Sequence, residues 1–229
     1  MKNIVMGVVA GSLLVLAVFG GGEKTMSQAQ PSMSTVQPQT QTQPVKTTIS
    51  IQEMMLRMDM RKLWEDHITW TRIYLISEIN NSPDARNVAA RLLKNQEDIG
   101  TAIKPYYGEE SGNKLTQLLQ AHIVGFIELT RAIKVNDQTA VTDITNKAYQ
   151  NAGEIGTLLS SVNPNWPAET VTGALREHVD LTKQEAMDMA NGNFDAGIAD
   201  YDRIHDQALR MADAFSDGIV KQFPEKLQP

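Results

Sequence analysis

The chain has 229 residues, of which 41% are apolar and 21% are charged, and its formal net charge at pH 7 is −6. That length is enough for one globular domain with a real core and some accessory sequence. An acidic balance without a basic block argues against nucleic acid as a partner. The absence of cysteine excludes disulfides, zinc fingers, iron–sulfur clusters and thiol catalysis.

The N-terminus carries the pattern of an export signal. Lys2 precedes residues 4–22, IVMGVVAGSLLVLAVFGGG, an apolar run without a charge. The run is also long enough to span a bilayer as a helix. Because no clear small-residue cleavage site follows it, we expect residues 1–22 to be either a cleaved signal peptide or a membrane anchor. In both cases the remainder is expected to be extracytoplasmic, secreted or membrane-anchored.

Residues 23–50 are expected to form a spacer. They are rich in Gln, Thr, Ser and Pro and nearly free of large apolar side chains, so they cannot bury enough surface to offset the entropy cost of ordering. We expect a disordered linker that carries a domain over residues 51–229. That domain has a net charge of −8, because residues 1–50 contain three lysines and one glutamate.

From residue 51 onward the hydrophobic pattern is helical nearly throughout, and alternating strand-like runs are absent. Clusters of Gly, Pro and Asn divide this part into six segments. The expected fold is therefore all-α, an up-and-down bundle of about six helices. The expected helices cover about 51–80, 84–104, 110–134, 137–161, 168–191 and 193–222.

An internal repeat relates these segments. NQEDIGTAI, which starts at Asn95, matches NAGEIGTLL, which starts at Asn151, 56 positions later. His122 and His178 are also 56 positions apart, and His67 lies 55 positions before His122. We therefore expect a helical hairpin that is used about three times, with a degenerate last copy.

The four histidines lie in line with apolar residues on the expected helices. His67, for example, falls in a 4-3-4-3 series with Met60, Trp64, Thr71 and Tyr74. This is the spacing of a buried helix seam. The sequence therefore predicts that a histidine is buried in the bundle.

The same pattern places further polar residues in the seams. His122 and His178 lie in comparable seams, His205 does so less cleanly, and two other helices carry Asn95 and Asn151 there. At about 1.5 Å of rise per residue, antiparallel neighbours bring all of them to a similar height. Each buried polar group left unpaired costs roughly 1–3 kcal/mol, so such a polar layer has to be satisfied.

Two ways to satisfy the layer remain open. One is a closed hydrogen-bond network that sets the register between similar hairpins. The other is a bound transition metal ion, such as Zn, Cu, Fe or Mn, or a small polar ligand. No Glu-x-x-His pair, the signature of di-iron bundles, occurs on these helices. The candidate metal ligands are His67, His122, His178, His205, Asp98 and Glu154.

Two other motifs are weaker candidates. MMLRMDM, residues 54–60, would suit copper(I) because thioethers are soft ligands, but we interpret it as helix core. Asp200-Tyr201-Asp202 matches a D-x-D motif of sugar-nucleotide transferases. That motif needs a loop at a strand end, whereas here it falls in a helical pattern, so we interpret it as chance.

Five phrases of the sequence carry a resemblance: LWEDHITWTR, RLLKNQEDIGTAIKPYYG, NPNWP, LREHVDLT and MADAFSDGIVKQFP. Together they resemble a functionally uncharacterised family of small secreted bacterial and archaeal helical-bundle proteins, over about residues 62–225. The resemblance implies an exported helical domain and supplies no activity. Some members are automatically labelled glycosyltransferases, for which these residues offer no mechanism.

The expected function is that of an extracytoplasmic binding domain whose interior layer takes a transition metal or a small polar ligand. The alternative is a non-catalytic structural or protein-interaction module, with the same layer as a register-setting network. An enzyme is less favoured, because no Ser-His-Asp arrangement or Gly-rich phosphate loop stands out. Membrane contact is expected only through residues 4–22, and the protein partner and any homo-oligomer stay open.

Overall fold

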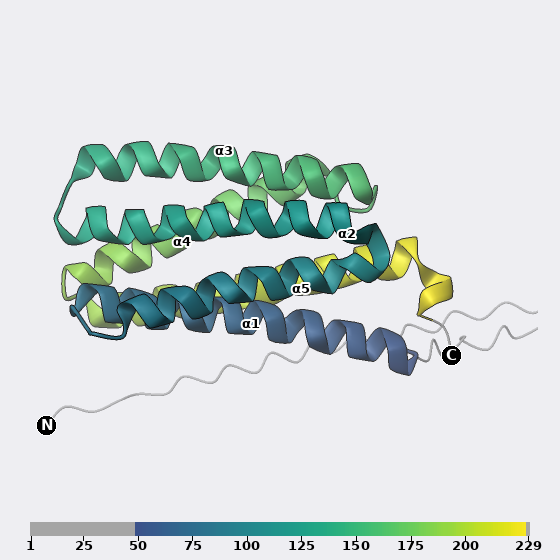
Figure 1. The fold of residues 1–229 in the computed structure, drawn as a ribbon. Helices are drawn as coiled ribbons and strands as arrows, with labels where there is room; N and C mark the ends of the chain where they lie inside the picture. Colours follow the sequence, from purple (N-terminus) through teal and green to yellow (C-terminus); the bar gives the residue numbers. More distant parts are fainter. Residues whose placement is uncertain (1–48, 228–229) are drawn as a thin grey trace, which may run out of the picture. The chain divides into compact units, whose positions relative to one another are not determined.

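The computed structural model describes residues 49–227 (Figure 1). This range is helical nearly throughout and contains no strand, which confirms the predicted all-α bundle. No helix in the range is long and apolar enough to cross a membrane. The predictions for residues 1–48, a signal peptide or anchor and a linker, lie outside the described residues. The helices are α1 (Ile51–Ile79), α2 (Ala85–Lys134), α3 (Gln138–Val162), α4 (Ala168–Ala190), α5 (Phe194–Gln222) and the 3-10 helix η1 (Pro224–Lys226).

Local sequence explains where several helices begin and end. The side chain of Ser50 accepts a hydrogen bond of 3.0 Å from the backbone N–H of Glu53, which satisfies one of the free donors in the first turn of α1. Just beyond the ends of α1 and α2, Asn81 and Asn136 have left-handed backbone conformations, with φ of 56° and 58°. Asparagine tolerates this conformation better than most residues, so these positions end the helices sharply.

The two helices that the sequence predicted on either side of Gly108 form one element, α2. Gly108 has a non-helical φ of 81° and ψ of 171°, and the chain reverses there (Figure 1). A Cβ built on Gly100 would lie 2.7 Å from the carbonyl oxygen of Gly112, although twelve residues of straight helix span about 18 Å. The structure thus has five α-helices in residues 49–227, because this turn is too tight to leave a loop. We call residues 85–107 and 109–134 the first and second limbs of α2.

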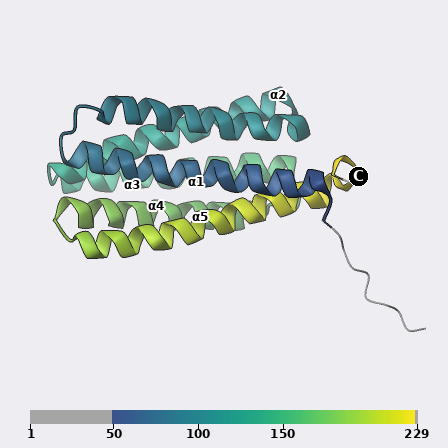
Figure 2. The same cartoon turned by 90° about the horizontal axis from the view of Figure 1, so that it is seen from below.

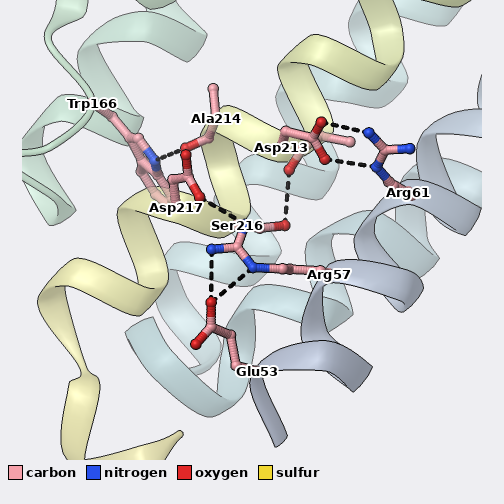
Figure 3. Close-up of polar contacts among 9 residues, drawn as sticks. Glu53, Arg57, Arg61, Trp166, Asp213, Ala214, Ser216 and Asp217 are labelled. Atoms are coloured by element: carbon pink, nitrogen blue, oxygen red, sulfur yellow. Dashed lines mark hydrogen bonds and ion pairs between the residues drawn. The ribbon is translucent and has the colours of Figure 1, made fainter. Parts of the chain in front are cut away.

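The bundle is closed, because α5 returns to pack beside α1 (Figures 1 and 2). Ion pairs line this contact (Figure 3): Arg57 bonds to Asp217 at 2.7 Å, and Arg61 forms two bonds of 2.7 and 2.6 Å to Asp213. Residue numbers rise on one helix as they fall on the other, so the two helices are antiparallel. Such solvent-accessible pairs contribute roughly 0.2–1 kcal/mol each, so apolar packing supplies most of the stability of this contact.

Apolar side chains form two main clusters along the bundle. The larger contains Met60, Trp64 and Ile68 of α1, and the second contains Tyr74 and Leu75 of the same helix. The side chains of His67 and Thr71 are buried where one cluster gives way to the other. The polar layer therefore lies inside the bundle, between two apolar regions.

The methionine-rich stretch of α1 is not core, contrary to the prediction. Met60 is buried, but Met54, Met55 and Met58 are 49%, 56% and 62% exposed. With Ile51 they occupy positions i, i+3, i+4 and i+7 and share a face that points away from the bundle. Both faces of the first turns of α1 are apolar, so the helical period alone could not identify the buried one.

Candidate functional site

Three of the four histidines meet inside the bundle. His67 of α1 and His178 of α4 are buried, and their ring centroids are 5.6 Å apart. His122, on the second limb of α2, is partly buried, and its ring centroid lies 6.4 Å from that of His178. The structure thus brings together imidazoles from three separate helices.

Each of these rings is held by an amide side chain from the next helix along the chain. The ring atom is Nδ1 in all three cases, and the amide residue follows its histidine by 29 positions. The same contact therefore recurs at the α1–α2, α2–α3 and α4–α5 junctions. The three pairs are His67 with Gln96 (3.2 Å), His122 with Asn151 (3.2 Å) and His178 with Gln207 (2.9 Å).

The amides at two junctions also bond to the main chain of the neighbouring helix. Nδ2 of Asn151 donates to the carbonyl oxygen of Leu118 at 3.0 Å, and Nε2 of Gln207 donates to that of Ala174 at 2.7 Å. Both carbonyls belong to the residue four positions before the histidine. A carbonyl oxygen has two lone pairs, so it can accept this bond beside its helical one. One amide thus holds both a ring and a carbonyl, which defines the height of one helix against the next.

At the α1–α2 junction two neighbouring residues share this task. Asn95 donates to the carbonyl oxygen of Leu63 at 3.0 Å, four residues before His67, while Gln96 meets the ring. Nε2 of Gln96 also donates to Oδ1 of Asn95 at 3.0 Å. Asn95 was predicted for the layer, whereas Gln96 and, at the α4–α5 junction, Gln207 were missed. The recurring interval of 29 residues would have identified both.

The amide orientations assign the tautomers of two of the rings. Nδ2 of Asn151 is a donor to a carbonyl, so its Oδ1 accepts the Nδ1–H of His122, whose Nε2 then holds a lone pair. His178 has the same tautomer, by the same argument with Gln207. Nε2 of Gln96 lies 3.2 Å from Nδ1 of His67, but its two hydrogens are donated to the carbonyl oxygen of Leu92 and to Oδ1 of Asn95, so this contact does not assign the tautomer of His67. The layer thus contains two Nε2 acceptors, on His122 and His178.

Burial favours the neutral form of these rings. Desolvation, aided by the nearby His178, lowers the pKa of His122 to about 4. Desolvation likewise lowers the pKa of His67 and of His178 below the usual 6.5. No carboxylate in residues 49–227 hydrogen-bonds to any of the three rings. An imidazolium here would therefore lack a bonded counter-charge.

The other predicted ligands lie outside this layer. Nε2 of His205 pairs with Glu65 at 2.9 Å on the surface between α5 and α1. Asp98 pairs with Lys94 at 2.6 Å, and Glu154 is exposed on α3. Each of the two carboxylates follows a layer asparagine by three residues, a rotation of about 60° round the helix. That rotation turns them away from the interior.

The predicted set of six metal ligands is therefore not assembled. No group of three or more His, Asp or Glu side chains in residues 49–227 is placed to hold a metal ion. Of the predicted set, His67, His122 and His178 come together, and Nδ1 of each is engaged by an amide. Metal binding by this layer would have to use the Nε2 atoms, and it stays a prediction.

Comparisons with family models, with curated proteins and with solved structures find no match. The resemblance to a family of secreted helical-bundle proteins therefore stays a prediction. The function has to be inferred from the chemistry of the site.

A second buried polar cluster, which the sequence did not predict, lies between α1, α4 and α5. The guanidinium of Arg72 pairs with Glu185 and donates to the carbonyl oxygen of Gly197 at 2.9 Å. Glu185 is 2% exposed, and desolvation raises its pKa to about 7 although Arg72 opposes the shift. Asp200, from the D-x-D motif, is also 2% exposed, lies inside α5 and pairs with Arg203. We call these groups the Arg72–Glu185 cluster.

Proposed function

We propose that this chain is a non-catalytic, extracytoplasmic structural or protein-interaction module in which the histidine–amide layer sets the register between helices. Export is inferred from Lys2 and the apolar run at residues 4–22, and residues 23–50 would hold the bundle away from the membrane or cell wall. One observation carries the proposal. Amide side chains at the α1–α2, α2–α3 and α4–α5 junctions bind both the ring and the main chain of the neighbouring helix.

The energetic argument is that these bonds require neighbouring helices to lie at one height. Sliding a helix by one turn, about 5.4 Å, would break both bonds of an amide and leave the amide and the ring buried without partners. Each such group costs roughly 1–3 kcal/mol. Contacts between Leu, Ile and Ala side chains are replaced by similar contacts after the same slide, so the polar layer discriminates between registers more strongly than the apolar clusters do.

We also propose that the junctions derive from one repeated hairpin of about 56 residues, with six helical segments when the limbs of α2 are counted separately. Close packing at matching positions supports this repeat. A Cβ built on Gly100 would collide with Oγ1 of Thr116, and one built on Gly156 would collide with Oγ1 of Thr172. Both members of the contact are shifted by the same 56 positions, so the two hairpins approach each other through equivalent small residues.

Binding of a transition metal or small polar ligand by the layer is the second proposal. It is favoured by the ring centroid distances of 5.6 and 6.4 Å and by the Nε2 atoms, which the amides leave unused. Neutral imidazole is a common transition-metal ligand. The proposal ranks second because the amides bond to the Nδ1 atoms of His122 and His178 and contact that of His67 without a ligand.

The register role can be tested at the α4–α5 junction with His178→Leu, Gln207→Leu and the double substitution. Each single change leaves a buried polar partner unpaired and should lower the free energy of unfolding in urea by about 1–3 kcal/mol. The double change removes both groups and should cost less than the sum. Because the chain has no cysteine, introduced cysteine pairs can carry spin labels that measure the distance between α4 and α5. We expect that distance distribution to broaden in the double variant.

His205→Ala is the matched control, because it removes an imidazole outside the layer, and it should leave the distance distribution unchanged. A narrow, wild-type distribution in the double variant would overturn the register role. Equilibrium dialysis against Zn²⁺ tests the second proposal, metal binding by the layer, independently of the register role. A metal that the wild type retains and the His67→Ala/His122→Ala variant loses would support binding by the layer.

A further inference from the structure

One junction of the layer differs from the other two. The position three residues after the histidine and the position three residues before the carbonyl-binding amide are large at α1–α2 and at α4–α5. Both are small at α2–α3, although the histidine and amide themselves are present. The residue three positions after the histidine is Trp70 at α1–α2, Gly125 at α2–α3 and Leu181 at α4–α5. The residue three positions before the amide is Leu92, Ala148 and Ile204, in the same order.

The missing side chains leave a groove of about 400 Å³ between the second limb of α2 and α3. A Cβ built on Gly125 would meet no atom within 4 Å, so the space above this residue is open. His122 and Asn151, the layer pair of this junction, line the groove. A small recess lined by His122, Gly125 and Ala148 continues toward side chains of α4. The groove therefore gives access to one ring of the histidine layer, and its volume lies within the usual range for ligand sites.

The accessible ring lacks one hydrogen-bond partner. Nδ1–H of His122 donates to Asn151, so its Nε2 is an acceptor, and no donor from residues 49–227 bonds to it. The ring of His67 neighbours that of His178, with centroids 5.6 Å apart, and forms no hydrogen bond to His122. A ligand in the groove that carries an N–H would match the lone pair of His122.

The charged groups of the groove favour a cation. Glu128 and Glu154 line it, and neither forms an ion pair within residues 49–227, while Lys147 is the one basic side chain among the lining residues. Because α2 and α3 are antiparallel and His122 meets Asn151, the two carboxylates lie on opposite sides of this level. At 1.5 Å per residue their Cα atoms are about 13 Å apart along the bundle. The stretch between them is bordered by small and apolar side chains, Gly125 and Ala148 among them, and on α3 also by Lys147 and Gln150.

We propose that the α2–α3 groove binds a small aliphatic diammonium ion. Its methylene chain lies over Gly125 and Ala148, one ammonium group donates to Glu154 and Nε2 of His122, and the other donates to Glu128. Such charge-assisted hydrogen bonds are stronger than neutral ones. This site goes beyond the proposed function, because the register of the layer does not depend on an occupied groove.

The probe is 1,4-diaminobutane, added to the full chain and followed by calorimetry and by the NMR signal of the His122 ring. We expect it to bind about tenfold more tightly than 1-aminobutane, because only the diamine reaches both carboxylates, while uncharged butane-1,4-diol should not bind. Glu128→Gln and Glu154→Gln should each weaken binding about two- to fivefold, as loss of one exposed charge contact predicts. Glu169→Gln, an exposed substitution on α4, is the matched control and should change nothing.

Gly125→Leu tests the site without disturbing the layer. It places at α2–α3 the side chain that Leu181 supplies at α4–α5, in open space and with a better helix former, so the variant should stay folded and lose diamine binding. Binding by this variant as tight as in the wild type would overturn the proposal. So would a wild type that does not respond to the diamine at tens of millimolar, or a His122 signal that responds to Zn²⁺ and not to the diamine. Diamine binding does not report on helix register. A negative result would therefore contradict the diamine site and leave the proposed structural role untouched.

Discussion

The histidine–amide layer and the Arg72–Glu185 cluster bury polar groups in the same bundle but stabilise them in opposite ways. The layer bonds neutral rings to neutral amides, whereas the cluster holds a carboxylate against a guanidinium. Burial disfavours the charged form in both places. It therefore lowers the pKa of His122 to about 4 and raises the pKa of Glu185 to about 7.

The two regions consequently respond to pH with opposite sign. Unfolded His122 binds its proton near pH 6.5 and the folded residue near pH 4, so its contribution to stability is complete above 6.5 and is lost as the pH falls toward 4. Folded Glu185 binds its proton near pH 7 and the unfolded residue near 4.5. Its ionisation costs stability above pH 7, and that cost is relieved as the pH falls toward 4.5. Between about pH 4.5 and 6.5 the two effects oppose each other.

The largest expected effect comes from breaking the charged cluster. Arg72→Met leaves the Glu185 carboxylate buried without its partner, which should lower the free energy of unfolding by about 3–5 kcal/mol at pH 8. The loss should be smaller at pH 5, where Glu185 can take up a proton. Urea denaturation at both pH values measures the difference. Arg72→Met/Glu185→Leu should recover much of the loss, and an equal loss at both pH values would show that Glu185 does not titrate near 7.

A smaller effect isolates the histidine layer. Glu185→Gln removes the opposing titration, so the free energy of unfolding should fall more steeply between pH 6.5 and 4.5 than in the wild type. His122 alone corresponds to roughly 3 kcal/mol over its full titration. Urea denaturation across this pH range measures both slopes. If the free energy of unfolding fell equally steeply with pH in the wild type and in Glu185→Gln, this would contradict the opposite pKa shifts that burial is expected to produce at His122 and Glu185.

The smallest expected effect is at the fourth histidine. His205→Ala removes a surface pair with Glu65, and such pairs contribute roughly 0.2–1 kcal/mol. The same urea experiment should therefore show a change well below that of His178→Leu. A loss as large as that of the layer substitution would indicate that His205 has a structural role that its surface position does not explain.

Much of the layer could be predicted from helical spacing. The period of apolar residues places His67, His122 and His178 on buried seams, and equal distances from the turns bring them to one height. The same reasoning was wrong for His205, which meets Glu65 at the surface. Spacing defines a face of a helix, but a face with mixed polarity does not show whether it points inward.

The hydrophobic pattern by itself determined that the chain folds as a helical bundle and placed His67, His122 and His178 on its seams, because both follow from contacts a few residues apart. Only the tertiary structure decided that Gln96 and Gln207 complete the layer, that Asp98 pairs with Lys94 while Glu154 is exposed, and that Arg72 meets Glu185. Those outcomes depend on how each helix is rotated against neighbours that lie far away in the sequence. The rotation is the result of packing the whole core at once, so no single segment encodes it.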